Sequence, residues 1–104
     1  MSIKGVLREE LENSERMKVR YEEELSDLPR GSLVKRLIKG NEYYYLVYRE
    51  AGKVQSKYRG TSSPDEIAEY AAARKKRAQY RQLLSKVKKQ IKFLKGALRG
   101  NDSI

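Results

Sequence analysis

The stretch that decides the fold spans residues 39–60 and reads KGNEYYYLVYREAGKVQSKYRG. It alternates runs of tyrosine and β-branched residues with the pairs Gly40-Asn41 and Ala51-Gly52, and two-residue turns that contain glycine are typical of β-hairpins. Together with the residues before it, this pattern predicts a meander of three antiparallel strands, at residues 32–39, 42–50 and 53–59.

The expected turns place Lys39 opposite Glu42 and Glu50 opposite Lys53, and the alternation of side chains along each strand defines two faces. One face is mostly apolar, and we expect it to rest on the helix that follows; it holds Val34, Arg36, Ile38, Tyr43, Tyr45, Val47, Arg49, Val54, Ser56 and Tyr58. The other face is basic and is expected to face solvent; it holds Leu33, Lys35, Leu37, Lys39, Tyr44, Leu46, Tyr48, Lys53, Gln55, Lys57 and Arg59. Lysines interleaved with tyrosines suit phosphates, sugars and base edges, although a solvated sheet face also carries lysine for solubility alone.

A helix is predicted on each side of the meander. In residues 1–28, the positions Ile3, Leu7, Leu11, Ser14, Met17, Tyr21, Leu25 and Leu28 recur with a mean spacing of about 3.6, the helical period. The second helix, at residues 63–99, begins with Ser63 as N-cap, Pro64 at the first helical position and Glu66 to close a capping box. Its heptad seam, with alternating steps of three and four residues, is Tyr70, Ala73, Arg77, Tyr80, Leu84, Val87, Ile91, Leu94 and Leu98.

The predicted fold is therefore α+β: an antiparallel two-helix coiled-coil hairpin with the three-stranded meander inserted between the helices. We expect a single domain at this length, with the strands at 30–60 and a short tail at 100–104. Charge pairs of Glu15 with Arg81 and of Glu22 with Arg74 fit one register of the two helices.

The second helix is longer than the first, so we expect its last residues to lack an intramolecular partner. An exposed apolar strip of this kind usually marks an interaction site, which predicts a homodimer or a hetero-complex. The partner-binding residues would be Ile91, Phe93, Leu94 and Leu98.

The chain has 104 residues, with 24 Lys and Arg against 14 Asp and Glu, a net charge of +10. Residues 1–28 carry a net charge of −3, so residues 29–104 carry +13, which favours a polyanionic partner. Cysteine and histidine are absent, which excludes disulfides, Cys/His zinc sites and catalysis by thiol or imidazole groups. We expect a protein that is not an enzyme and that uses no cofactor or metal. Without a secretory segment or a membrane span, a cytoplasmic location is expected.

The stretch at 39–60 resembles a recurring prokaryotic pattern, KGxxYYYLxYRExGKVxSxYxG, of a family of short uncharacterised proteins. Related stretches occur near the front of some transposases and other mobile-element proteins. The resemblance to the short-protein family extends over roughly residues 28–99 and implies no established activity. The order of three strands and a helix also resembles the arm-binding domain of tyrosine recombinases, which implies that the sheet face opposite the helix contacts DNA.

These features predict a nucleic-acid-binding accessory protein of a mobile element or phage, with DNA or RNA as its partner. The residues expected to bind it are Lys35, Tyr44, Tyr48, Lys53, Gln55, Lys57 and Arg59 on the sheet and Arg74 and Lys75 on the second helix. The alternative is a protein-interaction module, such as an antitoxin-like or inhibitor protein. It would dock on an acidic or nucleic-acid-binding surface of a larger partner.

Overall fold

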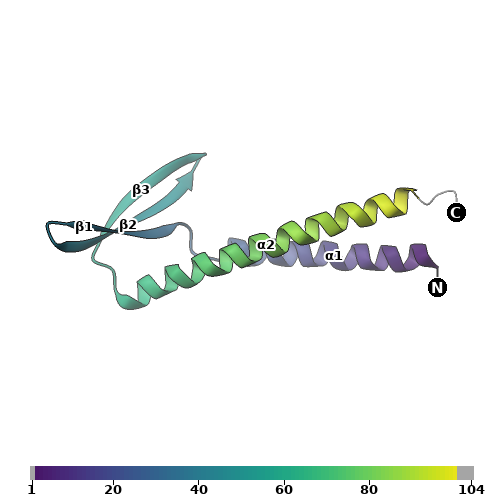
Figure 1. Ribbon diagram of the computed structural model, residues 1–104, viewed down its shortest axis with the longest axis horizontal. Coiled ribbons are helices and arrows are strands. Elements are labelled where there is room, and N and C mark those ends of the chain that lie inside the picture. The colour runs from purple at the N-terminus through teal and green to yellow at the C-terminus, as the bar shows by residue number, and fades with distance from the viewer. Residues whose placement is uncertain (1, 101–104) are drawn as a thin grey trace. The chain divides into compact units, whose positions relative to one another are not determined.

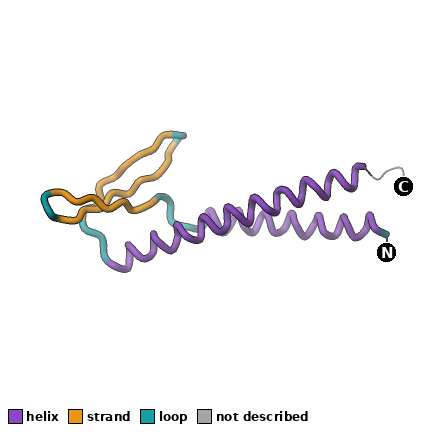
Figure 2. The backbone as a smooth tube through the Cα atoms, viewed as in Figure 1, coloured by secondary structure: helices purple, strands orange, loops and turns teal. Residues whose placement is uncertain are grey.

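The computed structural model describes residues 2–100, which form two helices and three strands (Figures 1 and 2). The elements are α1 (Ile3–Ser26), β1 (Ser32–Ile38), β2 (Asn41–Glu50), β3 (Lys53–Gly60) and α2 (Pro64–Gly100). The α+β class, with a three-stranded antiparallel sheet between two helices, is confirmed. Of the tail expected at 100–104, only Gly100 is among the described residues.

The chain divides into two compact units, and α2 contributes to both of them. The helical unit consists of residues 1–27 and 78–104, and thus of α1 and the C-terminal part of α2. The sheet unit consists of residues 28–77, which include the three strands and the first fourteen residues of α2.

Both helices begin at a serine. The backbone N–H of Glu66 donates to Oγ of Ser63 at 3.1 Å, so the expected N-cap of α2 is confirmed. The Glu66 carboxylate, however, lies 3.3 Å from the guanidinium of Arg59, so it pairs with a strand and not only with its own helix terminus. At the start of α1, Oγ of Ser2 accepts from the backbone N–H of Gly5 at 3.0 Å. Serine caps of this kind satisfy donors that have no partner within the helix.

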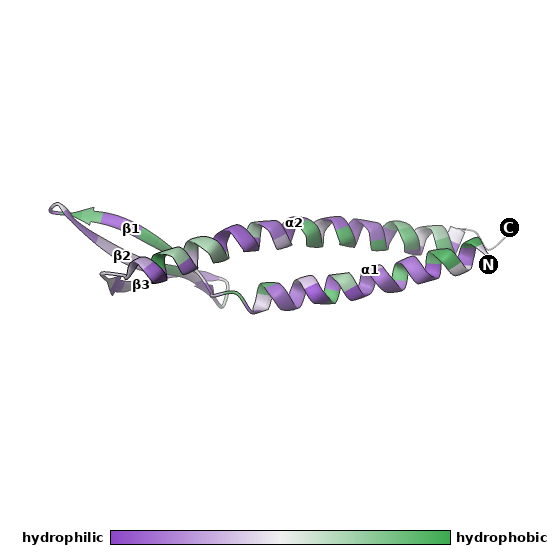
Figure 3. Ribbon diagram, turned by 90° about the horizontal axis from the view of Figure 1, so that it is seen from below, coloured by the Kyte–Doolittle hydropathy of each residue, from purple (hydrophilic) through white to green (hydrophobic). Residues whose placement is uncertain are grey.

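In the helical unit, low exposure recurs every three or four residues, and hydrophobic colour recurs along both helices in Figure 3. Along α2 the residues of low exposure are those of the expected seam, with Val87, Ile91 and Leu94 buried. Along α1 they include Leu7, Leu11, Ser14, Lys18, Tyr21 and Leu25. The rings of Tyr21 and Tyr80 have their centroids 6.0 Å apart, so residues from both helices meet in this unit.

The expected exposed strip at the end of α2 is wrong for Ile91 and Leu94, which are only 9% and 5% exposed. Leu98 is half-buried, and Phe93 alone of the four is strongly exposed, at 71%. The prediction failed because it placed the excess length of α2 at the C-terminus. The excess lies at the other end, since residues 64–77 belong to the sheet unit. Residues 78–100 then match α1 in length, at about 35 Å each.

The expected charge pair of Glu15 with Arg81 is also wrong. The Glu15 carboxylate lies 4.0 Å from the ammonium group of Lys95. Lys95 and Arg81 are about 21 Å apart along a helix, so one carboxylate cannot reach both.

The second hairpin of the sheet has the expected register. Glu50 lies opposite Lys53, and Ala51-Gly52 forms the turn between β2 and β3. Ala51 has φ +52° and Gly52 has φ +79°. Positive φ at both central residues is the type I′ geometry, whose twist matches that of the strands it joins.

The first hairpin is shifted from the expected register by two residues. Ile38 lies opposite Asn41, so Lys39-Gly40 forms the turn, with φ +52° and +79°. The expected pairing of Lys39 with Glu42 is therefore wrong. A shift of two residues keeps every side chain on its expected face, because faces alternate with a period of two.

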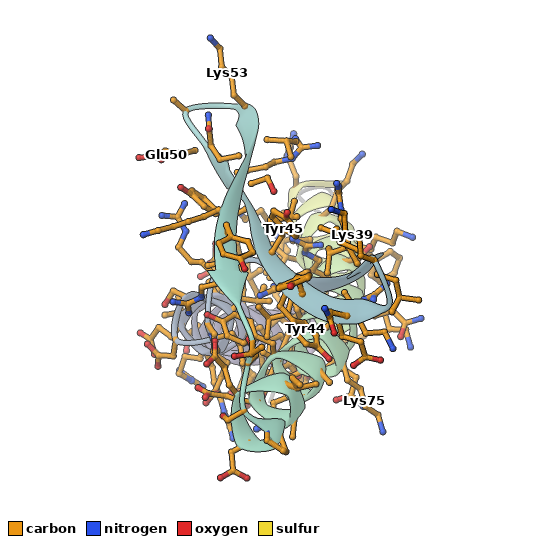
Figure 4. The ribbon with its side chains drawn as sticks, turned by 90° about the vertical axis from the view of Figure 1, so that its left-hand side faces the viewer. Lys39, Tyr44, Tyr45, Glu50, Lys53 and Lys75 are labelled. Carbon is orange, nitrogen blue, oxygen red and sulfur yellow. The ribbon has the colours of Figure 1, made fainter. Side chains whose placement is uncertain are left out.

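The face that packs on α2 is the opposite of the expected one. In Figure 4, Tyr44 lies on the side of the sheet that faces α2, and Tyr45 lies on the other side. Leu46 and Tyr48 lie on the same side as Tyr44. We call this side the inner face; it holds Leu33, Lys35, Leu37, Glu42, Tyr44, Leu46, Tyr48, Glu50, Lys53, Gln55 and Lys57.

The outer face holds Ser32, Val34, Arg36, Ile38, Asn41, Tyr43, Tyr45, Val47, Arg49, Val54, Ser56 and Tyr58. Its apolar residues were expected to form the contact with α2. Instead Val54 is 63% exposed and Tyr58 is 57% exposed, and Val34 and Ile38 are exposed as well. The number of apolar residues did not show which face packs on α2, because the inner face also has leucines and tyrosines that can make this contact.

Candidate nucleic-acid interface

The net positive charge is larger in the sheet unit than in the helical unit. Residues 28–77 contain twelve basic and five acidic residues, a net charge of +7. The residues of the helical unit contain twelve basic and nine acidic residues, a net charge of +3. The sheet unit is therefore the stronger attractor for a polyanion.

The lysines expected to bind nucleic acid remain exposed on the inner face. Lys53, Gln55 and Lys57 alternate along β3, and Figure 4 shows Lys53 at the tip of the β2–β3 hairpin. The ammonium group of Lys35 lies 3.5 Å from the carboxylate of Glu42, and both side chains are about half exposed. An exposed pair of this kind is weak, so a phosphate can compete for Lys35.

The two tyrosines expected on the binding surface, Tyr44 and Tyr48, are half-buried on the inner face. Because this face packs on α2, their rings serve the packing of the sheet unit. The structure therefore does not bring them together with the exposed lysines as one open surface.

Arg59 is also engaged within the sheet unit. Tyr44 pairs with Gly60 whereas Tyr45 pairs with Tyr58, so Arg59 is the extra residue of a β-bulge. Its guanidinium lies 3.3 Å from Glu66 and donates to the hydroxyl of Tyr70 at 3.5 Å. These contacts tie β3 to the first turns of α2.

The basic run at the start of α2 is divided between two roles. Arg74 and Lys75 are exposed, and Figure 4 shows Lys75 at the periphery of the unit. Arg77 is half-buried and donates to the backbone carbonyl of Pro29 at 2.6 Å. Arg74 and Lys75 are thus available to a phosphate, whereas Arg77 fixes the segment that enters the sheet.

The outer face carries a tyrosine cluster that sequence reasoning assigned to the core. The ring of Tyr58 lies 6.2 Å from that of Tyr43 and 5.4 Å from that of Tyr45, between centroids. The guanidinium carbon of Arg36 lies 5.1 Å from the centroid of the Tyr45 ring, a cation–π contact. We call Arg36, Tyr43, Tyr45 and Tyr58 the aromatic cluster.

The outer face holds no carboxylate within the three strands. Both acidic residues of the strands, Glu42 and Glu50, lie on the inner face, whereas Arg36 and Arg49 lie on the outer face. The arrangement offers rings for stacking and guanidinium groups for phosphates. The strand alternation already placed these residues on one face; only the side covered by α2 was misjudged.

The chain matches the model of a family described as "Domain of unknown function (DUF6788)" over residues 4–69. The chain belongs to the DUF6788 family. The match covers more than half of the chain, and it agrees with the expected resemblance to an uncharacterised family. It begins in α1 and ends in the second turn of α2, and so includes the whole sheet, whereas the expected resemblance ran from about residue 28 to 99. No curated protein and no solved structure matches the chain.

Two further findings concern residues 2–100. Neither helix in this range has an apolar stretch that could cross a membrane. Nor does this range contain a cluster of three or more side chains suited to a metal ion.

Proposed function

We propose that this DUF6788 protein is a non-enzymatic nucleic-acid-binding protein whose sheet unit makes the contact. The observation that carries the proposal is the outer face, where the exposed Tyr58, the half-buried Tyr43 and Tyr45, and two arginines lie on one side without a strand carboxylate. Phosphate contacts generally position such proteins, and contacts to bases or sugars add to them. A net charge of +7 on the same unit supports that division of roles.

In this proposal further phosphate contacts come from exposed basic residues on the inner face of the sheet and on α2. They are Lys35, Lys53 and Lys57 on the sheet and Arg74 and Lys75 on α2, with Gln55 beside them. Tyr44, Tyr48 and Arg59, which were expected to touch nucleic acid, support the sheet from its inner side. Exposure and lack of strong ion pairs favour the lysines for this role.

We propose that the helical unit is an antiparallel two-helix coiled coil that acts as a scaffold. The contacts support this arrangement, because Tyr21 meets Tyr80 whereas the earlier residue Glu15 meets the later residue Lys95. Low exposure at alternating steps of three and four residues along both helices is the pattern that such packing requires.

The setting we propose is that of an accessory protein of a mobile element or phage. It is supported by the resemblance of residues 39–60 to stretches near the front of transposases. Identification of the nucleic acid bound in the native cell would test this setting directly, since an element-specific sequence is the expected result.

The salt dependence of binding tests the proposed function. If about five phosphates are neutralised, log K falls with log salt at a slope near −4 to −5. The variant Lys53→Gln/Lys57→Gln should reduce this slope by about 2, because each lysine contributes about one released counterion. The matched control is Lys89→Gln/Lys92→Gln in the helical unit, which removes the same charge and should change the slope by less than 1.

Two results would overturn this function. One is an affinity that does not depend on salt, and the other is no binding to either single-stranded or duplex nucleic acid at ~50 mM salt, where electrostatic attraction is strong.

A second candidate function is protein interaction, and one observation favours it. Phe93 is 71% exposed and lies near Lys89, one helical turn earlier, and Lys92, which are also exposed. This surface fits an acidic partner protein with an apolar patch. A pull-down with and without nuclease separates the two functions: a protein partner retained after nuclease treatment supports this candidate, and loss of every partner supports direct nucleic-acid binding.

A further inference from the structure

We infer that the aromatic cluster binds unpaired bases, so that the protein prefers single-stranded nucleic acid to duplex. This inference rests on the proposed function and specifies its substrate class. It is carried by the exposure and the spacing of the rings on the outer face, together with the charges around them.

The ring of Tyr58 is open to a ligand, whereas Tyr43 and Tyr45 are half-buried. Tyr58 is 57% exposed, although two neighbouring rings lie within 6.2 Å of it. The rings of Tyr43 and Tyr45 are tilted against it by 42° and 62°. They therefore flank Tyr58 at an angle and leave more than half of its surface open. A flat base can stack on such a ring, and stacking of this kind needs no particular sequence.

The charges around the cluster fit a single strand. Arg36 lies over the ring of Tyr45, and a stacked guanidinium keeps its N–H groups free for a phosphate. Arg49 is exposed on the same face, and both strand carboxylates lie on the opposite face. A strand that crosses the outer face would meet guanidinium groups beside the rings and no acidic strand residue.

Duplex nucleic acid fits this face less well. Paired bases present their edges in the grooves and hide their flat surfaces, so their recognition uses hydrogen-bonding side chains. The outer face instead exposes Val34, Ile38 and Val54 around the rings. Apolar and aromatic surface of this kind has no partner on a phosphate backbone, but it can contact an unstacked base.

The experiment compares binding of a single-stranded oligonucleotide of about 15 nucleotides with binding of its duplex, by fluorescence anisotropy at ~50 mM salt. We expect the single strand to bind at least about tenfold more tightly. Tyr58→Ala should weaken single-strand binding by about 5- to 100-fold, which is the range for loss of one stacked base. It should weaken duplex binding by less than about threefold. Circular dichroism checks that the variant is folded, and the exposure of Tyr58 favours this.

The matched control is Tyr58→Phe, which keeps the ring and removes only the hydroxyl. It should bind single strands within about threefold of the wild type, since the ring makes the stacking contact. The chain contains eight tyrosines and no tryptophan, so its intrinsic fluorescence comes from tyrosine. Single-strand binding should quench this fluorescence, and Tyr58→Ala should reduce the quenching.

The outcomes separate this inference from the proposed function. Duplex binding as tight as single-strand binding, with no effect of Tyr58→Ala on either, would overturn the inference and leave the proposed function standing. Failure of both ligands to bind would overturn both. Equal losses for Tyr58→Ala and Tyr58→Phe would also overturn the inference, because the hydroxyl and not the ring would then make the contact.

Discussion

The two units of the chain differ in how many residues they bury, although both expose large apolar side chains. Four of the five buried residues within residues 2–100 lie in the helical unit, namely Ser14, Val87, Ile91 and Leu94. The sheet unit contributes only Ala73, and it exposes apolar and aromatic side chains on both sides of its three strands. The helical unit thus has the better-formed core. Its net charge, +3, is also smaller than the +7 of the sheet unit.

This difference suggests a division of labour between the units. A seam that is closed by its own side chains stabilises the fold but offers little to a ligand. A sheet that keeps Tyr58 and its arginines exposed gives up burial, and with it stability, for a surface that can bind. The same substitution made in each unit, with its effect on the free energy of unfolding measured, tests this division.

The largest expected effect is that of Leu94→Ala, in the seam of the helical unit. Leu94 is 5% exposed, and Leu-to-Ala changes in a core cost about 2–5 kcal/mol through lost transfer free energy and the cavity left behind. The matched change in the sheet unit is Leu37→Ala, where the leucine is 69% exposed. We expect that change to cost less than about 1 kcal/mol. Urea unfolding followed by circular dichroism measures both free energies.

The comparison would break down if the two variants lost similar stability. In that case Leu37 would be covered in solution, for example by a second copy of the chain. Repeating the unfolding at several protein concentrations checks this, because a dimer makes the midpoint depend on concentration.

Periodicity predicted much of the helical unit but not its pairing. The seam along α2 follows from a local spacing of three and four residues, and the cap at Ser63 follows from its neighbours. Which residues of α1 meet α2 depends on where the chain leaves the sheet, and this is not a local property. The expected Glu15–Arg81 pair was wrong for this reason, and Ile91 and Leu94 were wrongly expected to be exposed.

The candidate site was predicted in composition but not in exposure. Alternation placed Arg36, Tyr43, Tyr45 and Tyr58 correctly on one face. Whether that face is covered depends on how α2 packs, and both faces hold enough apolar residues to form the contact. The contacts of Arg59 with Glu66 and Tyr70 of α2 depend on a β-bulge, which leaves no periodic signal.

An intermediate effect is expected for Ser14→Ala, which sharpens the description of the helical seam. The Ser14 side chain is fully buried, and its hydroxyl has no hydrogen-bond partner among the described residues. A buried hydroxyl without a partner is destabilising, and alanine is the better helix former. We expect Ser14→Ala to raise the free energy of unfolding by about 1 kcal/mol.

The matched control is Ser85→Ala, at an exposed position of α2 in the same unit. It should give only the gain in helix propensity, about 0.5 kcal/mol. A loss of stability in Ser14→Ala, with the control unchanged or more stable, would show that the Ser14 hydroxyl makes a hydrogen bond in solution.

The smallest expected effect concerns the turns of the sheet unit. Both turns place glycine second, after Lys39 and after Ala51, and both of these residues have φ +52°. The sequence carries a signal for this. Glycine is the second turn residue in Ala51-Gly52, and the same arrangement in the first hairpin indicates Lys39-Gly40 as its turn. Alanine is disfavoured at positive φ, whereas Asn-Gly is a preferred type I′ pair. Ala51→Asn should therefore raise the free energy of unfolding by up to about 1 kcal/mol.

The same exchange at an exposed helical position, Ala72→Asn, should lower the free energy of unfolding by about 0.6 kcal/mol, since asparagine is a poorer helix former. Opposite signs for the two substitutions, measured by urea unfolding, would support the turn geometry. A loss of stability in both would show that Ala51 does not hold a positive φ in solution, and that the β2–β3 hairpin closes through a different turn.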